Sequence, residues 1–486
     1  MYLGIDIGTS GVKTAVVDDA GAVVGQSSAP LVVARPQPLW SEQNPEDWWS
    51  ATDLAVRSLP LALREGVRAI GLSGQMHGAT LLDRHRQVLR PAILWNDGRS
   101  AAECAALEAA VPSMTRITGN RAMAGFTAPK LLWLRTHEPA TFRAVATVLL
   151  PKDYVRLKLT GELASDVSDS AGTLWLDVAR RRWSPEMLAA TFLDESHMPA
   201  LFEGNEVTGM LRAEIAAGWG LKRVPVSAGG GDNAAGAVGA GVVRAGEAFL
   251  SLGTSGVLFL ATDGYTPHPQ GGVHTFCHAV PNRWHQMSVI LSAASCLEWA
   301  ARLCGLPDAG ALLALAEARN RPTASEIFLP YLSGERTPHN DPRAQGVVFG
   351  LTHESDAGAI AQGVLEGVAF ACRDGLDALL ASGQAIESIA VIGGGARSAY
   401  WGAILSSALG RPLIYRDSAT IGPAFGAARL ARMAVERSPV DEVCTPPPIL
   451  HVVEPDRRLQ PHLAATLDRY RRLYTDLKDR FRETAS

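Results

Sequence analysis

The sequence predicts an α/β protein made of two similar domains with a cleft between them. The first observation behind this is a repeated motif, Gly4-Ile5-Asp6-Ile7-Gly8-Thr9-Ser10-Gly11 near the start and Leu250-Ser251-Leu252-Gly253-Thr254-Ser255-Gly256 about halfway along. Each copy is an apolar run that leads into Gly-Thr-Ser-Gly, which is typical of a buried strand ending in a tight turn. The second observation is size, because 486 residues with 47% hydrophobic content can fill two cores.

The two Gly-Thr-Ser-Gly turns, which we call the first tip (residues 8–11) and the second tip (residues 253–256), are candidate phosphate sites. A tight glycine-rich turn exposes backbone N–H groups, and Thr and Ser add hydroxyl donors beside them. Two such tips across a cleft would hold a phosphate chain from both sides. The alternative is a pair of ordinary hairpins. The residues concerned are Gly8, Thr9 and Ser10 in the first tip and Gly253, Thr254 and Ser255 in the second.

Asp6 distinguishes the first copy of the motif from the second, which has no acid in its strand. A carboxylate beside a phosphate-binding turn repels phosphate unless a cation lies between them. Mg²⁺ suits that place, because it binds carboxylate and phosphate oxygens and keeps several waters. We therefore expect Asp6 to lie at a magnesium site, with an ordinary turn or capping residue as the alternative.

The elements of the first half follow in order from their patterns. Residues 3–7, 12–17 and 23–24 are expected to form a strand, turn and strand arrangement that leads an α/β domain. Asn44 is a good helix N-cap before Pro45, and the acids after it favour the positive end of a helix. Further strands are expected at 67–72, 79–82 and 224–228, and helices at 101–110, 128–136 and 234–243.

The second half is expected to begin near Arg244–Gly246, just before the second copy of the motif. This gives an N-terminal domain of residues 1–244 and a C-terminal domain of residues 245–486. A buried strand is expected at 387–392, ahead of the triple glycine Gly393-Gly394-Gly395. The stretch from Leu463 to Phe481 carries apolar residues at 3–4 spacing, which predicts an amphipathic packing helix.

Composition and charge argue against several classes of partner. The net charge of −4, with acids and bases well mixed, gives no basic footprint for nucleic acid or an anionic membrane. No apolar run reaches the roughly 20 residues that cross a bilayer, and the strand beginning next to Met1 argues against a secretory signal. The six cysteines form no C-x-x-C pair, so free thiols in a reducing cytoplasm are expected. The oligomeric state stays open, with a homodimer as one alternative.

Asp232 is the sharpest catalytic candidate. It follows Gly229-Gly230-Gly231 at the end of an expected strand, so its carboxylate can project from a sharp turn into a cleft. A carboxylate there could take the proton from an attacking alcohol during phosphoryl transfer. The neighbouring Asn233 can hydrogen-bond a hydroxyl-rich ligand. The alternative is that Asp232 simply caps the following helix, and both roles can hold together.

Two further glycine-bounded loops follow strands. Gln75, Met76 and His77 combine polar groups with an apolar side chain, which fits a sugar pocket, with His77 as a donor to the sugar. The alternative for His77 is a partly buried loop histidine bonded to backbone. The triple glycine at 393–395 would let a flat ring or a phosphate approach the backbone, or is a plain turn. No Gly-Lys pair occurs, so a Walker A lysine is absent.

Taken together, these motifs resemble those of the FGGY carbohydrate kinases, which have two actin-like ATPase (ribonuclease H-like) domains. The resemblance runs essentially end to end. Beyond the two tips it rests on the segments Ser73-Gly74-Gln75-Met76-His77-Gly78, Pro91-Ala92-Ile93-Leu94-Trp95-Asn96-Asp97-Gly98-Arg99, Gly125-Phe126-Thr127-Ala128-Pro129-Lys130-Leu131-Leu132-Trp133, Gly229-Gly230-Gly231-Asp232-Asn233 and Gly393-Gly394-Gly395-Ala396-Arg397-Ser398.

The resemblance implies roles for these residues. Asp232 would be the catalytic base, Asp6 would lie near Mg²⁺ and the phosphates, and the two tips would hold the phosphates of ATP. Gly393, Gly394, Gly395 and Arg397 would lie against the nucleotide, and Gln75, Met76, His77, Asp232 and Asn233 would contact the sugar. The 75–77 loop favours a ketopentose, D-xylulose, over glycerol. Alternatives are a kinase of ribulose, gluconate or glycerol, and an actin-like binding protein switched by nucleotide.

Overall fold

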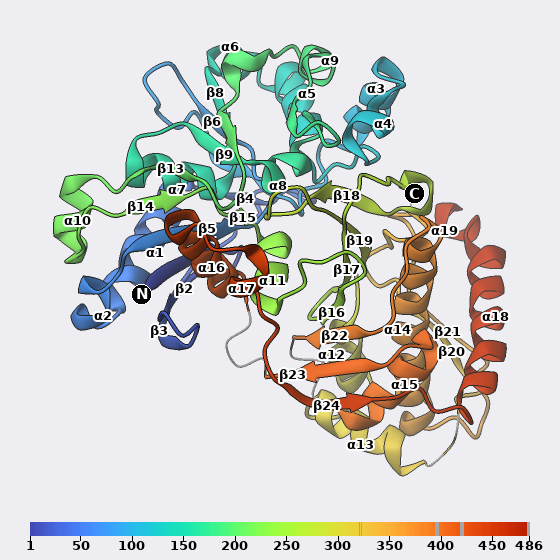
Figure 1. Ribbon diagram of the computed structural model, residues 1–486. Coiled ribbons are helices and arrows are strands. Elements are labelled where there is room, and N and C mark those ends of the chain that lie inside the picture. The colour runs from blue at the N-terminus through green and yellow to red at the C-terminus, as the bar shows by residue number, and fades with distance from the viewer. Residues whose placement is uncertain (320, 322, 394–397, 418–421, 484–486) are drawn as a thin grey trace.

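The computed structural model describes residues 1–319, 321, 323–393, 398–417 and 422–483. Within these residues the chain forms two halves, each built around a seven-stranded sheet with helices packed against it (Figure 1). The first sheet comes from the N-terminal half, and the second comes from the C-terminal half. This confirms the predicted α/β class with two similar domains.

The first sheet places the opening hairpin at its centre. Across the sheet its strands are β13 (Val207–Met210), β14 (Pro225–Ser227), β5 (Ala69–Gly74), β1 (Tyr2–Ile7), β2 (Gly11–Val17) and β3 (Val23–Pro30), and β15 (Gly230–Gly231) also pairs with β5. Strand β1 pairs antiparallel with β2 and parallel with β5. Every residue of β1 is buried, as expected for a strand at the centre of a covered sheet.

The second sheet repeats this arrangement. Its strands, in order, are β18 (His274–Cys277), β19 (Trp284–Ile290), β17 (Gly256–Thr262), β16 (Ala248–Leu252), β22 (Ile389–Ile392), β23 (Leu413–Arg416) and β24 (Ile449–Val453). Strand β16 pairs antiparallel with β17 and parallel with β22, as β1 does with β2 and β5. The duplicated motif therefore marks a duplicated piece of architecture.

Helix α1 (Pro45–Ser58) begins where the sequence predicts. The Asn44 side chain accepts a hydrogen bond from the Glu46 backbone N–H at 3.2 Å, which satisfies one of the unpaired donors of the first turn. The other helices of this half are α2 (Leu61–Glu65), α3 (Ala101–Ala110), α4 (Met114–Thr118), α5 (Thr127–His137), α6 (Pro139–Ala144), α7 (Pro151–Thr160), α8 (Val167–Ser170), η1 (Ala171–Thr173), α9 (Pro185–Ala190), η2 (Glu195–His197), α10 (Ala213–Trp219) and α11 (Asp232–Ala240).

The helices of the second half follow one another along the described part of the chain. They are η3 (Pro269–Gly271), α12 (Ala294–Leu303), α13 (Ala309–Ala318), α14 (Ala357–Leu380), α15 (Ala399–Leu409), α16 (Pro423–Glu436), α17 (Val440–Val443), α18 (Gln460–Leu477) and α19 (Arg480–Glu483). The short strands outside the two main sheets are β4 (Glu42–Gln43), β6 (Thr80–Leu82), β7 (Ala92–Ile93), β8 (Thr147–Leu149), β9 (Ala164–Asp166), β10 (Leu176–Asp177), β11 (Arg182–Trp183), β12 (Ala200–Phe202), β20 (Ile327–Leu329) and β21 (Val347–Phe349).

Several elements, α11 among them, differ from the prediction in their bounds. Helix α11 covers residues 232–240 and not 234–243, because Gly241 takes a left-handed conformation with φ 73° that ends it. Strand β6 matches the strand predicted at 79–82, and it pairs with β8 in a separate two-stranded sheet. The predicted helix at 463–481 is divided into α18 and α19.

Helix α16 belongs to the second half of the chain but packs on the first sheet, against β1, β5 and α11 (Figure 1). The approach is close: a Cβ at Gly4 would lie 1.8 Å from the Ala424 carbonyl oxygen, and a Cβ at Gly71 would lie 1.8 Å from that of Ala427. Glycine at these two strand positions is therefore what allows the helix to cover the sheet.

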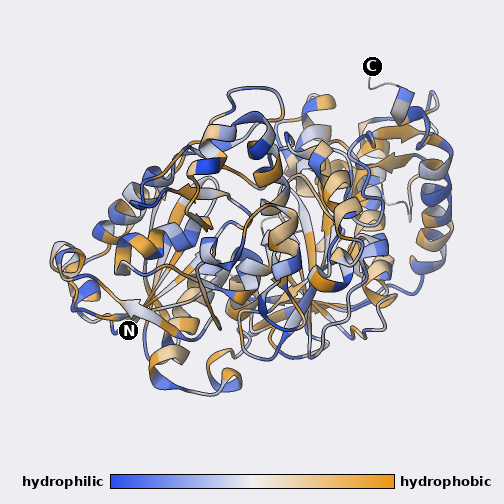
Figure 2. Cartoon of the chain, turned by 90° about the horizontal axis from the view of Figure 1, so that it is seen from above, coloured by the Kyte–Doolittle hydropathy of each residue, from blue (hydrophilic) through white to orange (hydrophobic). Residues whose placement is uncertain are grey.

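An apolar core also joins the two halves. One continuous buried cluster contains Trp175 and Leu174 of the first half together with Phe249, Phe259 and Phe276 of the second sheet. Figure 2 shows the apolar residues gathered along the inner strands and the polar ones on outer helices such as α18. The halves are therefore packed against each other and not only tethered by the chain.

Candidate active site

Three neighbouring strand ends bring Asp6, the 75–77 loop and Asp232 to one edge of the first sheet. In the parallel register Asp6 of β1 lies opposite Ser73 of β5, and Ser73 lies opposite Gly230 of β15. The chain therefore leaves these three strands at nearly the same height along the sheet. The carboxyl edge of an open parallel sheet is where ligands usually bind in such folds.

Asp6 is a buried carboxylate with a free oxygen. Asp6 is only 7% exposed, and within the described residues its Oδ1 has no hydrogen-bond partner. Burial, and then the nearby charge of Asp232, raise the pKa of Asp6 to about 7. An unpartnered carboxylate oxygen beside a second acid is a donor set that fits Mg²⁺, which binds through one or two carboxylates plus phosphates.

Lys13 is a candidate that the sequence reasoning missed. It lies directly opposite Asp6 in the β1–β2 register, and both residues line one cavity of about 570 Å³. Its ammonium is the nearest charge that opposes the carboxylate in this hairpin, where it lowers the pKa of Asp6. The available signal was that Lys13 is the one charged residue in the otherwise small and apolar run 11–17.

Asp232 is the first residue of α11 and is partly buried. Its Oδ1 accepts the backbone N–H of Asn233 at 2.7 Å and the Asn233 Nδ2 at 2.9 Å. Within the described residues no hydrogen bond falls on Oδ2, so that oxygen is available to a ligand. Burial raises the pKa of Asp232 to about 6, and the two Asn233 bonds oppose this rise. The N-cap of α11 is Gly231, without a side-chain cap bond, so the structure does not support the alternative of Asp232 as the helix cap.

His77 is held as a neutral ring. Its Nδ1 lies 2.7 Å from the Gly172 carbonyl oxygen, and burial, followed by the charge of Lys130, lowers the pKa of His77 to about 3. Because a carbonyl only accepts, Nδ1 carries the proton and Nε2 is left as an acceptor. The structure therefore corrects the predicted donor role of His77: toward a sugar hydroxyl its ring can only accept.

Apolar groups surround this ring. Phe126 lies with its ring centroid 4.6 Å from that of His77, and Met76 is buried against Gly231, where an added Cβ would be 3.0 Å from the Met76 Cγ. Met76 therefore packs against the turn that precedes Asp232, and Phe126 packs against the ring of His77. Phe126 carried no sequence signal as a site residue, because a lone aromatic is more often core.

Gln75 is buried and bonded to neighbouring side chains. Its Oε1 accepts the Thr9 hydroxyl at 2.8 Å, its Nε2 donates to Gln43 Oε1 at 2.8 Å, and only 2% of the residue is exposed. Gln75 Oε1 and one of the two Nε2–H groups therefore bond within the protein, which positions the first tip. Contact of Gln75 with the sugar stays a prediction.

The first tip is shaped by bonds to its neighbours. Gly8 N–H donates to the Gly11 carbonyl at 3.0 Å, and the Thr9 hydroxyl, besides its bond to Gln75, accepts from Trp95 Nε1 at 3.0 Å. Ser10 is exposed. Of the predicted hydroxyl donors in this tip, Ser10 is therefore the one left for a ligand.

The second tip and Gly393 are neighbours at one edge of the second sheet. Strand β22, which ends just before Gly393, pairs in parallel with β16, which leads into the second tip, and Ser251 lies opposite Ile392. Gly393 has φ 96°, and a Cβ there would be 2.8 Å from the Leu252 carbonyl oxygen, so the turn requires glycine. The Thr254 carbonyl accepts the Ser295 hydroxyl at 2.7 Å, while Thr254 itself is exposed. Gly394, Gly395 and Arg397 lie outside the described residues.

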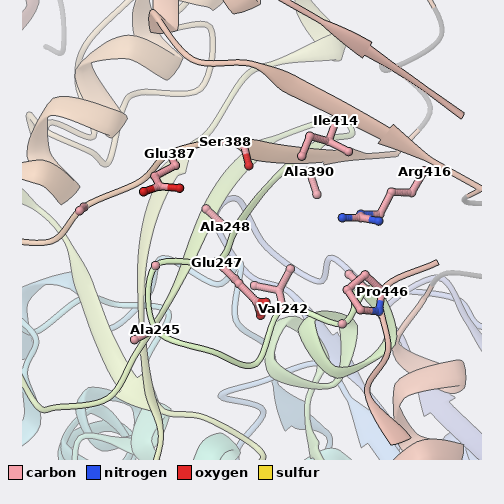
Figure 3. Close-up of a pocket in the computed structure, with 14 residues that line it drawn as sticks. Val242, Ala245, Glu247, Ala248, Glu387, Ser388, Ala390, Ile414, Arg416 and Pro446 are labelled. Atoms are coloured by element: carbon pink, nitrogen blue, oxygen red, sulfur yellow. The ribbon is translucent and has the colours of Figure 1, made fainter. Parts of the chain in front are cut away.

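A separate cavity of about 430 Å³ lies between the end of α11, the starts of β16 and β22, and β23 (Figure 3). Glu247, Glu387 and Arg416 are its charged lining residues. Of the predicted site residues that the structure describes, none lines this cavity, so it is distinct from the described part of the candidate active site.

Two further observations concern metals and membranes. Among the described residues, no group of three or more His, Cys, Asp or Glu side chains is placed to hold a metal ion. A cation at Asp6 would thus depend on ligands from phosphate and water.

In the same part of the chain, no helix has both the length and the apolar character that a bilayer crossing needs.

Comparison with known proteins identifies the family of this chain. Residues 1–239 match the family model described as the N-terminal domain of the FGGY family of carbohydrate kinases, and residues 248–435 match the one for its C-terminal domain. The chain belongs to the FGGY family. The predicted boundary near Arg244–Gly246 falls in the interval between the two matches, and it stays a prediction.

The full-length relatives point the same way. The chain is 54% identical to the xylulose kinase of Escherichia coli strain K12, over 98% of this chain and 99% of that one. It is also 54% identical to the xylulose kinase of Klebsiella pneumoniae, with the same coverage. A crystal structure described as a xyloylose kinase from Brucella ovis superposes with a TM-score of 0.94 at 50% identity, covering 98% of this chain and 99% of that one.

Proposed function

We propose that this FGGY kinase transfers the γ-phosphoryl group of ATP to D-xylulose, giving D-xylulose 5-phosphate and ADP. The observation that carries the proposal is the placement of Asp232 and Asp6 on strand ends either side of β5, which leads into Met76 and His77. A base, a cation site and a sugar-binding loop then share one sheet edge. The identity to named xylulose kinases supports the choice of sugar.

In the proposed reaction Asp232 is the general base. Its free Oδ2 takes the proton of the attacking sugar hydroxyl as the new oxygen–phosphorus bond forms, and the bond from the γ-phosphorus to the bridging oxygen of ADP breaks. With a pKa of about 6, the carboxylate is mostly ionised at neutral pH and still basic enough to accept a proton. The Asn233 bonds to Oδ1 keep Oδ2 as the reactive oxygen.

The sugar is proposed to lie against Met76 and His77. The His77 Nε2 accepts a hydrogen bond from a sugar hydroxyl, Met76 and Phe126 contact the carbon side, and the remaining Asn233 Oδ1 accepts from a second hydroxyl. Neutral His77 suits this role, because an imidazolium could not accept. His77→Ala is expected to raise KM for the sugar more than it lowers kcat.

ATP is proposed to lie along the two tips, with its base near Gly393. Backbone N–H groups of both tips and the Ser10 hydroxyl would donate to the phosphates, and Lys13 would add a positive charge. Gly394, Gly395 and Arg397 remain predicted nucleotide contacts. Mg²⁺, when bound through Asp6, would neutralise charge that builds up on the phosphates. Closure of the cleft would keep water from competing with the sugar.

The remaining expectations from the sequence form part of the same proposal. Sugar and nucleotide are the partners, with no nucleic acid and no membrane, in a reducing cytoplasm. A homodimer and the division at residues 244 and 245 are kept as predictions. Light scattering and limited proteolysis would test these two.

The decisive experiment measures ADP release with and without D-xylulose, at fixed ATP and Mg²⁺. We expect release to depend on the sugar, and D-xylulose to give a higher kcat/KM than ribulose, gluconate or glycerol. Preference for one of the other sugars would replace the substrate but keep the reaction. ATP turnover that no sugar stimulates would favour the actin-like, nucleotide-switched binding protein instead.

A further inference from the structure

One buried segment, residues 167–173, contacts both sides of the proposed site. It consists of α8 and η1. Near its start the Ser168 hydroxyl oxygen accepts the Gly231 backbone N–H at 3.2 Å, directly before Asp232. Near its end the Gly172 carbonyl accepts from His77 Nδ1 at 2.7 Å. The same short segment thus sets the turn that carries Asp232 and the tautomer of His77.

Asp166 fixes the start of this segment. Its Oδ1 accepts the Ser168 N–H at 2.8 Å, the Asp169 N–H at 3.1 Å and the Ser168 hydroxyl. The Ser168 hydroxyl proton is therefore given to Asp166, which leaves its oxygen lone pair directed to the Gly231 N–H. The hydroxyl has one geometry, and it transmits the position of Asp166 to the turn before Asp232.

Asp166 is in turn anchored to a buried ammonium. Lys152 Nζ lies 2.7 Å from Asp166 Oδ2, 2.7 Å from Asp153 Oδ1 and 2.9 Å from Asp169 Oδ2, with none of these side chains exposed. Burial alone would lower the pKa of Lys152, but the three acids raise it above its ordinary value. Lys152 also packs closely against β5, because a Cβ added at Gly74 would lie 3.1 Å from the Lys152 Cβ.

We propose that Ser168 is a positioning residue for phosphoryl transfer, which holds the Gly231–Asp232 turn in register with the buried Lys152 cluster. This inference rests on the proposed role of Asp232 as the base. Within the described residues no hydrogen bond joins the Ser168 side chain to Asp232 or His77, so its effect passes through the backbone of Gly231. A misplaced base costs rate more than binding.

The test compares Ser168→Ala with a matched control, Ser406→Ala. Ser406 is equally buried and its hydroxyl also makes two bonds, to the Arg411 and Val453 carbonyls at 3.0 and 2.9 Å, but it lies in α15 away from the site. We expect Ser168→Ala to lower kcat by about 10–100-fold with KM for sugar and ATP within about twofold. Ser406→Ala is expected to keep kcat within about twofold of the wild type. It should lose about as much thermal stability as Ser168→Ala.

Hydrogen–deuterium exchange without substrates gives a readout that does not depend on the sugar. Ser168→Ala should speed exchange at the Gly231 amide, and Ser406→Ala should not. Ser168→Cys, close in size but a weak acceptor, should fall between Ser168→Ala and the wild type, and it replaces Ser168→Ala if that variant does not fold. Unchanged kcat and unchanged Gly231 exchange in the tested variant would overturn the proposal, as would an equal kcat loss in Ser406→Ala. If the wild type phosphorylates no sugar, the proposed function fails, while the exchange result still judges the Ser168 contact.

Discussion

At the scale of single residues, the carboxylate of Asp232 has the environment that a base needs. Burial raises its pKa to about 6, and Asn233 occupies one oxygen and leaves the other free. Asp232→Ala should therefore lower kcat by about 10²–10⁴-fold, because general-base catalysis contributes that much. Stability and ATP affinity should change little. Steady-state kinetics, with thermal unfolding and ATP titration as controls, measure the effect; a variant with near-normal turnover would remove Asp232 from the mechanism.

The pH dependence provides a second test at this scale. A base must be ionised, so kcat/KM should rise as the pH increases through about 6, the pKa of Asp232. The neighbouring Asp6, with a pKa of about 7, ionises in the same range, so the pH profile is compared between variants that share Asp6. Asn233→Ala removes a hydrogen bond that stabilises the carboxylate, which raises that pKa. The acidic limb of the pH profile of Asn233→Ala should thus move to higher pH. A pH profile of kcat/KM for each protein measures the limb, and a shift to lower pH in Asn233→Ala would contradict the assignment.

Sequence reasoning at this scale identified residue types but not their bonds. It placed His77 in the site, yet it could not show that the Gly172 carbonyl, 95 residues away, fixes the proton on Nδ1. It placed Gln75 there too, but it could not show the bonds of its amide to Thr9 and Gln43. Which partner a buried polar group finds depends on contacts distant in sequence. Lys13 was missed for the same reason, since its register with Asp6 is a property of the sheet.

At the scale of elements, local signals were accurate where a cap or a tight turn defined them. The helix after Asn44 and the hairpin of β1 and β2 match their predictions closely. The end of α11 did not, because Gly241 was taken as one more small residue of the helix, and it instead takes a left-handed C-terminal turn. Strand β6 was predicted, but its partner β8 lies beyond what a local pattern can show.

Helix α7 allows a prediction about the buried charges that support the site. Lys152→Met leaves Asp166 and Asp169 buried without the cation they share, while Arg156 stays 3.6 Å from Asp153, and should cost about 3–5 kcal/mol of unfolding free energy. Lys158→Met in the same helix removes an exposed pair with Glu46 and should cost under about 1 kcal/mol. Urea unfolding of both variants measures the difference. Equal losses would show that the cluster contributes no more than a surface pair.

The loss of unfolding free energy in Lys152→Met should depend on pH in a definite direction. Burial raises the pKa of Asp169 and the charge of Lys152 opposes this rise, so Lys152→Met should raise that pKa further. As the pH falls toward about 5, Asp169 takes up a proton that the unfolded chain, with an Asp pKa of about 4, does not yet bind. Stability of Lys152→Met should therefore approach that of the wild type on acidification. A deficit that grows as the pH falls would contradict this account.

At the scale of the whole molecule, the duplicated tips predicted two related halves, and the structure has them. The sequence did not show that α16 returns from the second half to cover the first sheet. Its apolar face indicates burial but does not identify the surface that buries it. The glycines at positions 4 and 71 were the available signal, since each accommodates a backbone carbonyl of α16 where a side chain would clash. They were read only as parts of strands.

The contact between α11 and α16 ties this packing to the site. A Cβ at Gly426 would lie 1.7 Å from the Ala235 carbonyl oxygen, so Gly426→Ala must push the two helices apart. Alanine is favoured over glycine in a helix by about 1 kcal/mol, yet overpacking should reverse this and give a net loss on the order of 2 kcal/mol. Because α11 begins at Asp232, kcat should fall as well.

Gly264→Ala is the control, since no heavy atom lies within 4 Å of its added Cβ. It should leave both unfolding free energy and kcat near the wild-type values. Urea unfolding and sugar-dependent ADP release, measured on both variants, separate the steric effect of α16 from a general effect of replacing glycine. If Gly426→Ala matched Gly264→Ala in both measurements, the helix pair would tolerate displacement, and the packing of α16 could not be what holds Asp232 in place.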